Sequence, residues 1–142
     1  MPIPPYEDTT FDACGTTLAW SIGDQFGVRE RVTEKQNGVL YEYKGPMSTD
    51  ITAPDGGSID ELDNSGYFSV FERNDGALVF DVHGPALVYA FTPEEAAAFE
   101  AAGLPEAFYY RNGKLVFITR ADGTVTIREQ PRRVVDVCDL LT

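Results

Sequence analysis

Two cysteines, Cys14 and Cys138, are the residues whose chemistry could join the two ends of this chain. Cys14 lies in the segment Phe-Asp-Ala-Cys-Gly-Thr-Thr, and Cys138 lies in Val-Asp-Val-Cys-Asp-Leu-Leu. A bond between them would close a loop of most of the chain and restrain the unfolded state by about 4–5 kcal/mol. Without that bond, they would be two small, buried apolar residues near the termini. We favour pairing, because they stand at both ends of what reads as one domain.

The only histidine, His83, precedes Gly84-Pro85, at the end of an expected strand. A Ser-His-Asp or Cys-His centre would need a nucleophile beside it, and the sequence has no G-x-S-x-G segment that would present one. We therefore expect His83 to be a structural or surface residue. We expect that the protein is not an enzyme. The less favoured alternative is a small hydrolase.

The types and spacing of the possible ligand residues give little support for a metal or cofactor site. Two cysteines and one distant histidine do not make a zinc set. Residues 60–66 (Asp-Glu-Leu-Asp-Asn-Ser-Gly) offer oxygen ligands for calcium, but not in the order of an EF-hand loop. No glycine-rich phosphate loop follows an expected strand. We expect no metal site and no cofactor.

Tyrosine pairs are the remaining candidates for a binding surface. Tyr41 with Tyr43, and Tyr109 with Tyr110, could face a carbohydrate or a protein partner. In strands, such residues more often pack in the core on one side and form cross-strand pairs on the other. We favour the packing role.

The elements that must position these residues are short strands. Alternating apolar segments recur about every eight to twelve residues between turn sequences such as Asn37-Gly38, Asn112-Gly113 and Asp122-Gly123. Residues 86–91 are apolar throughout, which is typical of a strand buried on both faces. The pattern predicts an all-β fold, an antiparallel β-sandwich or barrel of about nine or ten short strands.

One helix is expected near residues 93–102. Thr92 is a suitable N-cap, Pro93 suits the first helical position, and Glu95 completes a capping box. Gly103 ends the helix. The chain as a whole divides into an extended, proline-rich N-terminal arm (1–12) and a single β-sandwich domain (13–142).

The net charge of −12 makes the protein strongly acidic. Such a protein repels phosphate backbones, so we expect no nucleic-acid partner. No apolar segment approaches the length of about 18 residues that a membrane helix needs, so we expect no membrane insertion. The start lacks the basic and apolar regions of a signal peptide. Either a leader was removed or the protein is made without one, and Met1 favours the second.

The two cysteine segments resemble the opening and closing segments of small all-β proteins of actinobacteria. These proteins open with an aromatic residue before Cys-Gly and close with an Asp-apolar-Cys-x-Leu-Leu ending, matched here by residues 11–17 and 134–141. The resemblance is clear at the two ends of the chain, whereas the middle shares only the general character of those sequences. It implies that Cys14 and Cys138 are bridged. Similar domains occur as minor tail or other virion proteins of phages that infect these bacteria.

The resemblance implies a non-enzymatic structural or adhesive component of an actinobacteriophage virion, such as a minor tail, decoration or other head or tail accessory protein. Its partners would be other virion proteins or copies of itself, and it would be assembled in the host cytoplasm. The alternative is a secreted, extracellular actinobacterial β-sandwich binding domain of unknown ligand. The cellular members carry signal peptides, and the Met1 start favours the phage version.

We expect the N-terminal arm to form part of the contact between subunits. Its prolines restrict the backbone, so less conformational entropy is lost when the arm docks. Twelve extended residues span up to about 40 Å, enough to reach a neighbour. The alternative is an arm folded back beside Cys14. Deletion of residues 2–9 is expected to weaken self-association or entry into particles, measured by sedimentation and by particle content. A truncated protein that folds and assembles as well as the intact one would exclude the arm as an assembly element.

Overall fold

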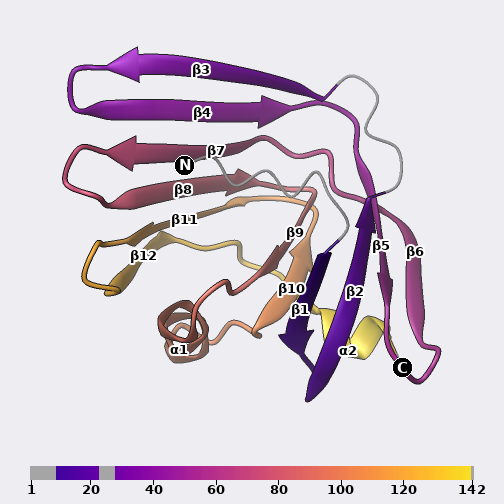
Figure 1. Ribbon diagram of the computed structural model, residues 1–142. Helices are drawn as coiled ribbons and strands as arrows, with labels where there is room; N and C mark the ends of the chain where they lie inside the picture. The colour runs from indigo at the N-terminus through magenta and orange to yellow at the C-terminus, as the bar shows by residue number, and fades with distance from the viewer. Residues whose placement is uncertain (1–8, 23–27, 142) are drawn as a thin grey trace.

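The computed structural model describes residues 9–22 and 28–141 (Figure 1). Within these ranges the chain forms thirteen strands and two short helices. All strand pairings are antiparallel, and the strands form sheets of six, four and three. The predicted all-β fold class is therefore confirmed. There are more strands than the nine or ten expected, partly because residues 9–12, expected in the arm, belong to a strand.

The six-stranded sheet has the order β12-β11-β8-β7-β4-β3. Val70, Phe80 and Phe117 lie side by side across its centre, and the rings of Phe80 and Phe117 stack at 4.7 Å between centroids. All three are buried, so this face of the sheet carries one half of the core. The strands are β3 (Arg29–Lys35), β4 (Gly38–Lys44), β7 (Phe68–Arg73), β8 (Leu78–His83), β11 (Lys114–Thr119) and β12 (Val125–Glu129).

The first hairpin of this sheet turns one residue earlier than Asn37-Gly38 predicts. Lys35 pairs with Gly38, so Gln36 and Asn37 form the turn and Gly38 begins β4. A Cβ atom on Gly38 would lie 2.3 Å from the carbonyl oxygen of Glu72 in β7. The glycine is therefore needed for the close approach of two strands rather than for the turn conformation.

The four-stranded sheet has the order β1-β2-β5-β6, and its strands run steeply across those of the larger sheet (Figure 1). Its strands are β1 (Thr9–Ala13), β2 (Thr16–Ile22), β5 (Ser48–Thr52) and β6 (Ser58–Asp63). β1 includes residues 9–12, which the sequence placed in the arm. They join the sheet because Phe11 and Ala13 alternate onto its buried face, where both are less than a tenth exposed. Residues 1–8 of the expected arm lie outside the described residues.

The three-stranded sheet lies between the other two (Figure 1), and its strands β9 and β10 are buried on both faces. Its order is β13 (Val135–Asp136), β10 (Ala107–Tyr110) and β9 (Ala86–Tyr89). β13 leads directly into helix α2 (Val137–Leu140). The burial of Ala86–Tyr89 agrees with the strand buried on both faces that the sequence predicts.

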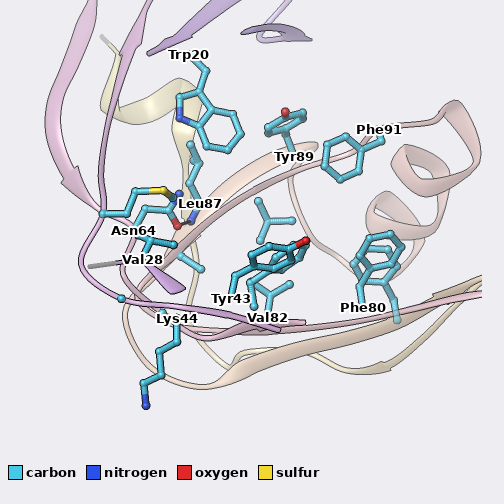
Figure 2. A pocket seen from close by; sticks show the side chains of 17 residues that line it. Trp20, Val28, Tyr43, Lys44, Asn64, Phe80, Val82, Leu87, Tyr89 and Phe91 are labelled. Carbon is cyan, nitrogen blue, oxygen red and sulfur yellow. Dashed lines mark hydrogen bonds between the residues drawn. The ribbon is translucent and has the colours of Figure 1, made fainter. Parts of the chain in front are cut away.

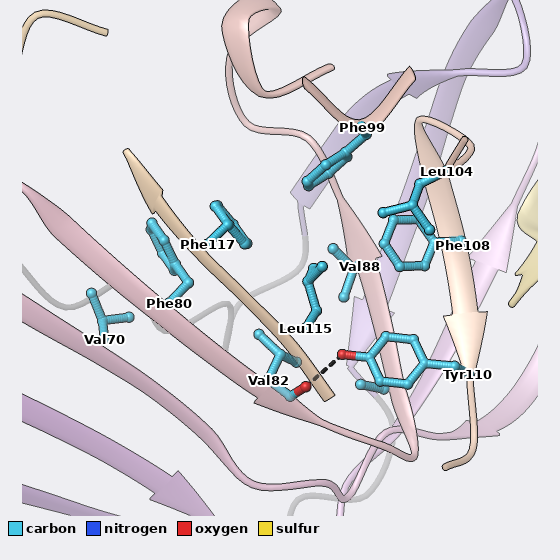
Figure 3. Close-up of a cluster of buried hydrophobic side chains, with 11 residues drawn as sticks. Val70, Phe80, Val82, Val88, Phe99, Leu104, Phe108, Tyr110, Leu115 and Phe117 are labelled. Carbon is cyan, nitrogen blue, oxygen red and sulfur yellow. Dashed lines mark hydrogen bonds between the residues drawn. The ribbon is translucent and has the colours of Figure 1, made fainter. Parts of the chain in front are cut away.

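Alternate side chains of β9 and β10 enter two separate cores. One core lies against the six-stranded sheet and contains Val88, Phe108 and Tyr110 (Figure 3). The other lies against the four-stranded sheet and contains Leu87 and Tyr109. The middle sheet therefore organises the two outer sheets into layers on either side of it.

Helix α1 (Pro93–Ala101) confirms the predicted helix. The Thr92 hydroxyl accepts a hydrogen bond from the Glu95 N–H at 3.1 Å, which is the predicted cap. The Glu95 carboxyl group is only 2% exposed; one oxygen accepts from the Phe91 N–H at 2.9 Å and the other from the Thr119 hydroxyl at 2.8 Å. Glu95 thus ties the start of the helix to β11. Neither helix in the described part of the chain is long and apolar enough to cross a membrane.

The substitution Glu95→Ala is expected to lower the free energy of unfolding by about 2–3 kcal/mol, because it leaves a partly buried N–H and a partly buried hydroxyl without their acceptor. The exposed neighbour Glu94 provides the matched control: Glu94→Ala should cost less than about 1 kcal/mol. Urea denaturation of both variants makes the comparison. Equal losses would contradict the bridging role of Glu95.

Candidate functional site

An apolar pocket of about 80 Å³ lies where the six-stranded sheet, β9 and β2 meet (Figure 2). Apart from Lys44, the residues that line it are uncharged, and Figure 2 shows the Lys44 side chain directed away from the space. Aromatic rings form much of the wall, as is common in sites for small molecules. They belong to Trp20, Tyr43, Phe68, Phe80, Tyr89, Phe91 and Phe117.

Tyr89 is the centre of an aromatic cluster at one end of the pocket. Its ring stacks on Phe11 at 4.2 Å between centroids and meets Trp20 and Phe91 edge-on at 5.3 Å and 4.9 Å. These are favourable geometries for aromatic pairs. Burial raises the pKa of the Tyr89 hydroxyl to about 12, so this hydroxyl remains neutral at ordinary pH.

Trp20 contributes an unsatisfied hydrogen-bond donor to this region. The side chain is 3% exposed, and its Nε1–H finds no acceptor among the described residues. The nearby Asn64 is engaged at both ends of its amide: its Nδ2 donates to Thr49 Oγ1 at 3.3 Å, and its Oδ1 accepts from the Leu87 N–H at 3.1 Å. A buried donor without an acceptor costs about 1–3 kcal/mol. The indole nitrogen is itself enclosed, with less than 1 Å² of accessible surface.

Cys14 and Cys138 form a disulfide with a Cα–Cα distance of 5.5 Å, which confirms the predicted pairing. The bond joins the β1–β2 turn to helix α2. Cys14 and Gly15 both have positive φ, 59° and 70°, as both central residues of a tight type I′ hairpin do. The Cys14 N–H donates to Glu106 Oε1 at 2.9 Å. The bridge therefore holds a non-glycine residue in a conformation that favours glycine.

His83 lies on the face of β8 opposite to Phe80 and Val82, away from the pocket. Its Nε2 is 3.1 Å from Asp81 Oδ1, and its ring meets Tyr67 edge-on. The two atoms are close enough to form an ion pair when His83 is protonated, although they lack the alignment of a hydrogen bond. The structure does not bring His83 to either cysteine, whose sulfurs are bonded to each other and offer no thiolate.

Tyr67, which packs against His83, belongs to a polar network on the same outer face. Its hydroxyl donates to Glu42 Oε2 at 2.6 Å, and Arg31 pairs with Glu42 at 2.8 Å. The Tyr67 hydrogen bond, followed by Arg31, holds the pKa of Glu42 below its usual value. Burial and the bond to Glu42 raise the pKa of Tyr67. This network pairs its charges internally.

The acidic segment 60–66 has structural partners. The Asp63 side chain accepts from the Ser65 N–H and hydroxyl, and Asn64 links β5 to β9. The backbone N–H of Glu61 donates to Asp50 Oδ1. Among the described residues, no group of three or more His, Cys, Asp or Glu side chains is placed to hold a metal ion.

Of the four tyrosines considered as binding residues, Tyr43 lines the pocket. Tyr43 is buried, and so are Tyr109 and Tyr110, whose hydroxyls donate to the carbonyl oxygens of Asp63 and Val82. Tyr41 is half-buried in β4. Trp20 is a pocket residue that the sequence does not predict. Its only signal was a single tryptophan in a strand with one buried face, which does not distinguish a site from a core.

Comparisons with protein-family models, with curated proteins and with solved structures found no match to this chain.

Two contributions to stability can be separated at the disulfide: its restraint on the unfolded chain, and the conformational cost of positive φ at position 14. Cys14→Ala with Cys138→Ala should lower the free energy of unfolding by about 3–5 kcal/mol, because the unfolded chain gains freedom. Cys14→Asn with Cys138→Ala should recover about 1 kcal/mol of this loss, because asparagine tolerates positive φ better than alanine. Urea denaturation followed by tryptophan fluorescence measures both. Equal stability of the two double variants would contradict a conformational cost at position 14.

Proposed function

We propose that the protein is a non-enzymatic structural or adhesive component of an actinobacteriophage particle. The observation that carries the proposal is the disulfide between Cys14 and Cys138, which closes almost the whole domain. Disulfides persist in oxidising surroundings, including the surfaces of virions, and are rare in reducing cytoplasm. The resemblance of the two cysteine segments to those of phage and actinobacterial proteins supports the same setting.

In this role, the protein is assembled inside the host and is exposed on release, when the covalent link between its ends preserves the fold. Its partners are other virion proteins or copies of itself. The edge strand β3 suits such a role because it is exposed along most of its length and rich in charge. Charged edge strands resist indiscriminate pairing with other sheets. Contacts within a particle would then use specific surfaces instead of an open sheet edge.

A secreted actinobacterial binding domain is the second candidate, and the aromatic pocket is the observation that favours it. A concave, aromatic-lined space is the kind of site that holds a small molecule. A structural subunit has no need of such a space. The two candidates share the fold and the disulfide, and they differ in where the protein is found.

The test is mass spectrometry of particles purified from a lysate of the host, digested without reduction. We expect peptides of this chain at a constant ratio to the major virion proteins, with the Cys14 and Cys138 peptides joined. Culture medium of uninfected cells is the control. Absence from washed particles would contradict the virion role, and recovery from uninfected medium would establish the secreted alternative.

A further inference from the structure

We propose that the outer face of the six-stranded sheet binds a linear polysaccharide that carries carboxylate groups. The binding surface is a row of cationic side chains at one end of the sheet, which begins at Arg29 and Lys44 and continues through His83 to Lys114. The inference rests on the adhesive role proposed above and goes beyond it by naming the class of polymer to which the protein adheres.

The strand register places these side chains on one face. Arg29 of β3 is directly opposite Lys44 of β4, and Lys114 of β11 is directly opposite His83 of β8. Lys44, His83 and Lys114 each adjoin a residue of the same strand that is buried on the inner face, so the row is directed outward. Tyr67 stands between the two pairs, where its carbonyl oxygen accepts from the His83 N–H at 2.8 Å.

The pair of Arg29 and Lys44 makes this row unusual. Side chains directly opposite in an antiparallel pair are close neighbours, and like charges there destabilise the sheet. Both side chains are exposed, and neither forms an ion pair with a described residue. The next pair on this face has opposite charges, because Arg31 meets Glu42 at 2.8 Å. Positions that break a rule of local stability are expected at functional sites, and an anionic partner would remove this repulsion.

The other end of the row is also cationic. Arg111 is exposed in the turn before Lys114, and Arg132 is exposed beside Pro131, which lies against that turn. Neighbouring strands are about 4.8 Å apart, so the row spans about 19 Å from Arg29 in β3 to Lys114 in β11. A linear polymer contacts several of these cations at once, whereas a small anion reaches only one pair.

Carboxylates beside the row favour a polymer whose charges are widely spaced. Asp81 Oδ1 lies 3.1 Å from His83 Nε2. Glu129 Oε1 lies 3.6 Å from Lys114 Nζ. These groups repel a polymer of high charge density such as a nucleic acid, as does the net charge of −12. A polysaccharide places neutral hydroxyl groups between its carboxylates, and the guanidinium of Arg29 suits a carboxylate because it can donate two parallel hydrogen bonds.

Three polymers test the proposal on the intact protein, with binding measured by isothermal titration calorimetry. Hyaluronan is linear and carries a carboxylate on alternate sugars, dextran is neutral, and a single-stranded oligonucleotide carries a charge on every unit. We expect hyaluronan to bind, dextran not to bind, and the oligonucleotide to bind more weakly than hyaluronan. The affinity for hyaluronan should fall as salt is raised, because the contact is electrostatic.

Two charge-matched double variants locate the contact. Arg29→Gln with Lys44→Gln should weaken hyaluronan binding about tenfold, the effect of losing two surface ion pairs. Lys35→Gln with Arg120→Gln removes the same charge from exposed residues at the opposite end of the sheet, and it should leave the affinity unchanged. In urea denaturation, Arg29→Gln with Lys44→Gln should be at least as stable as the native protein, because the repulsive pair is gone.

Four results would overturn the inference. No binding of hyaluronan by the native protein would reject a carboxylated polysaccharide as the partner, and tighter binding of the oligonucleotide would assign the row to nucleic acid. Unchanged affinity after loss of Arg29 and Lys44 would place the contact elsewhere. Equal losses in the two double variants would show a response to net charge alone. None of these results changes the peptide content of purified particles, which tests the virion role separately.

Discussion

The structure depends on covering both faces of β9 and β10. Successive side chains of a strand point to opposite faces, so these apolar strands need an apolar layer on each side. The hydroxyls of the adjacent tyrosines show the result: Tyr109 donates to Asp63 in the four-stranded sheet, and Tyr110 donates to Val82 in the six-stranded sheet. The two outer sheets are thereby attached to the same central strand, each through one tyrosine hydrogen bond.

The pocket belongs to this layered arrangement. It lies where β9 ends and the strands of the outer sheets run steeply across each other, and large rings line it from both sides. Aromatic rings pack in a few preferred geometries, and Tyr89 satisfies three of them at once with Phe11, Trp20 and Phe91. Protein interiors are usually close-packed and hydrogen-bonded, so an apolar space in the core and a buried indole N–H without a partner are both unusual.

Both ends of the domain are held by bonds to segments distant in the sequence. The disulfide attaches the β1–β2 turn to α2, and Glu106 accepts from the Cys14 N–H in the same turn. The buried carboxyl group of Glu95 plays a comparable part for α1, which it joins to β11. The polar groups at these junctions are satisfied, in contrast to the indole of Trp20.

The sequence by itself determined the elements whose causes are local. The cap at Thr92, the alternation of apolar residues and the apolar run over 86–91 depend on neighbours within a few residues, and they predict the helix, the strands and the all-β class. Only the tertiary structure decided the turn before Gly38, where the opposing backbone of β7 limits the space, and the pairing of β1 with β2. It also decided the pocket, because Trp20 and the rings facing it come from strands far apart in the chain. The unpaired state of the indole N–H depends on every atom around it, which no local pattern specifies.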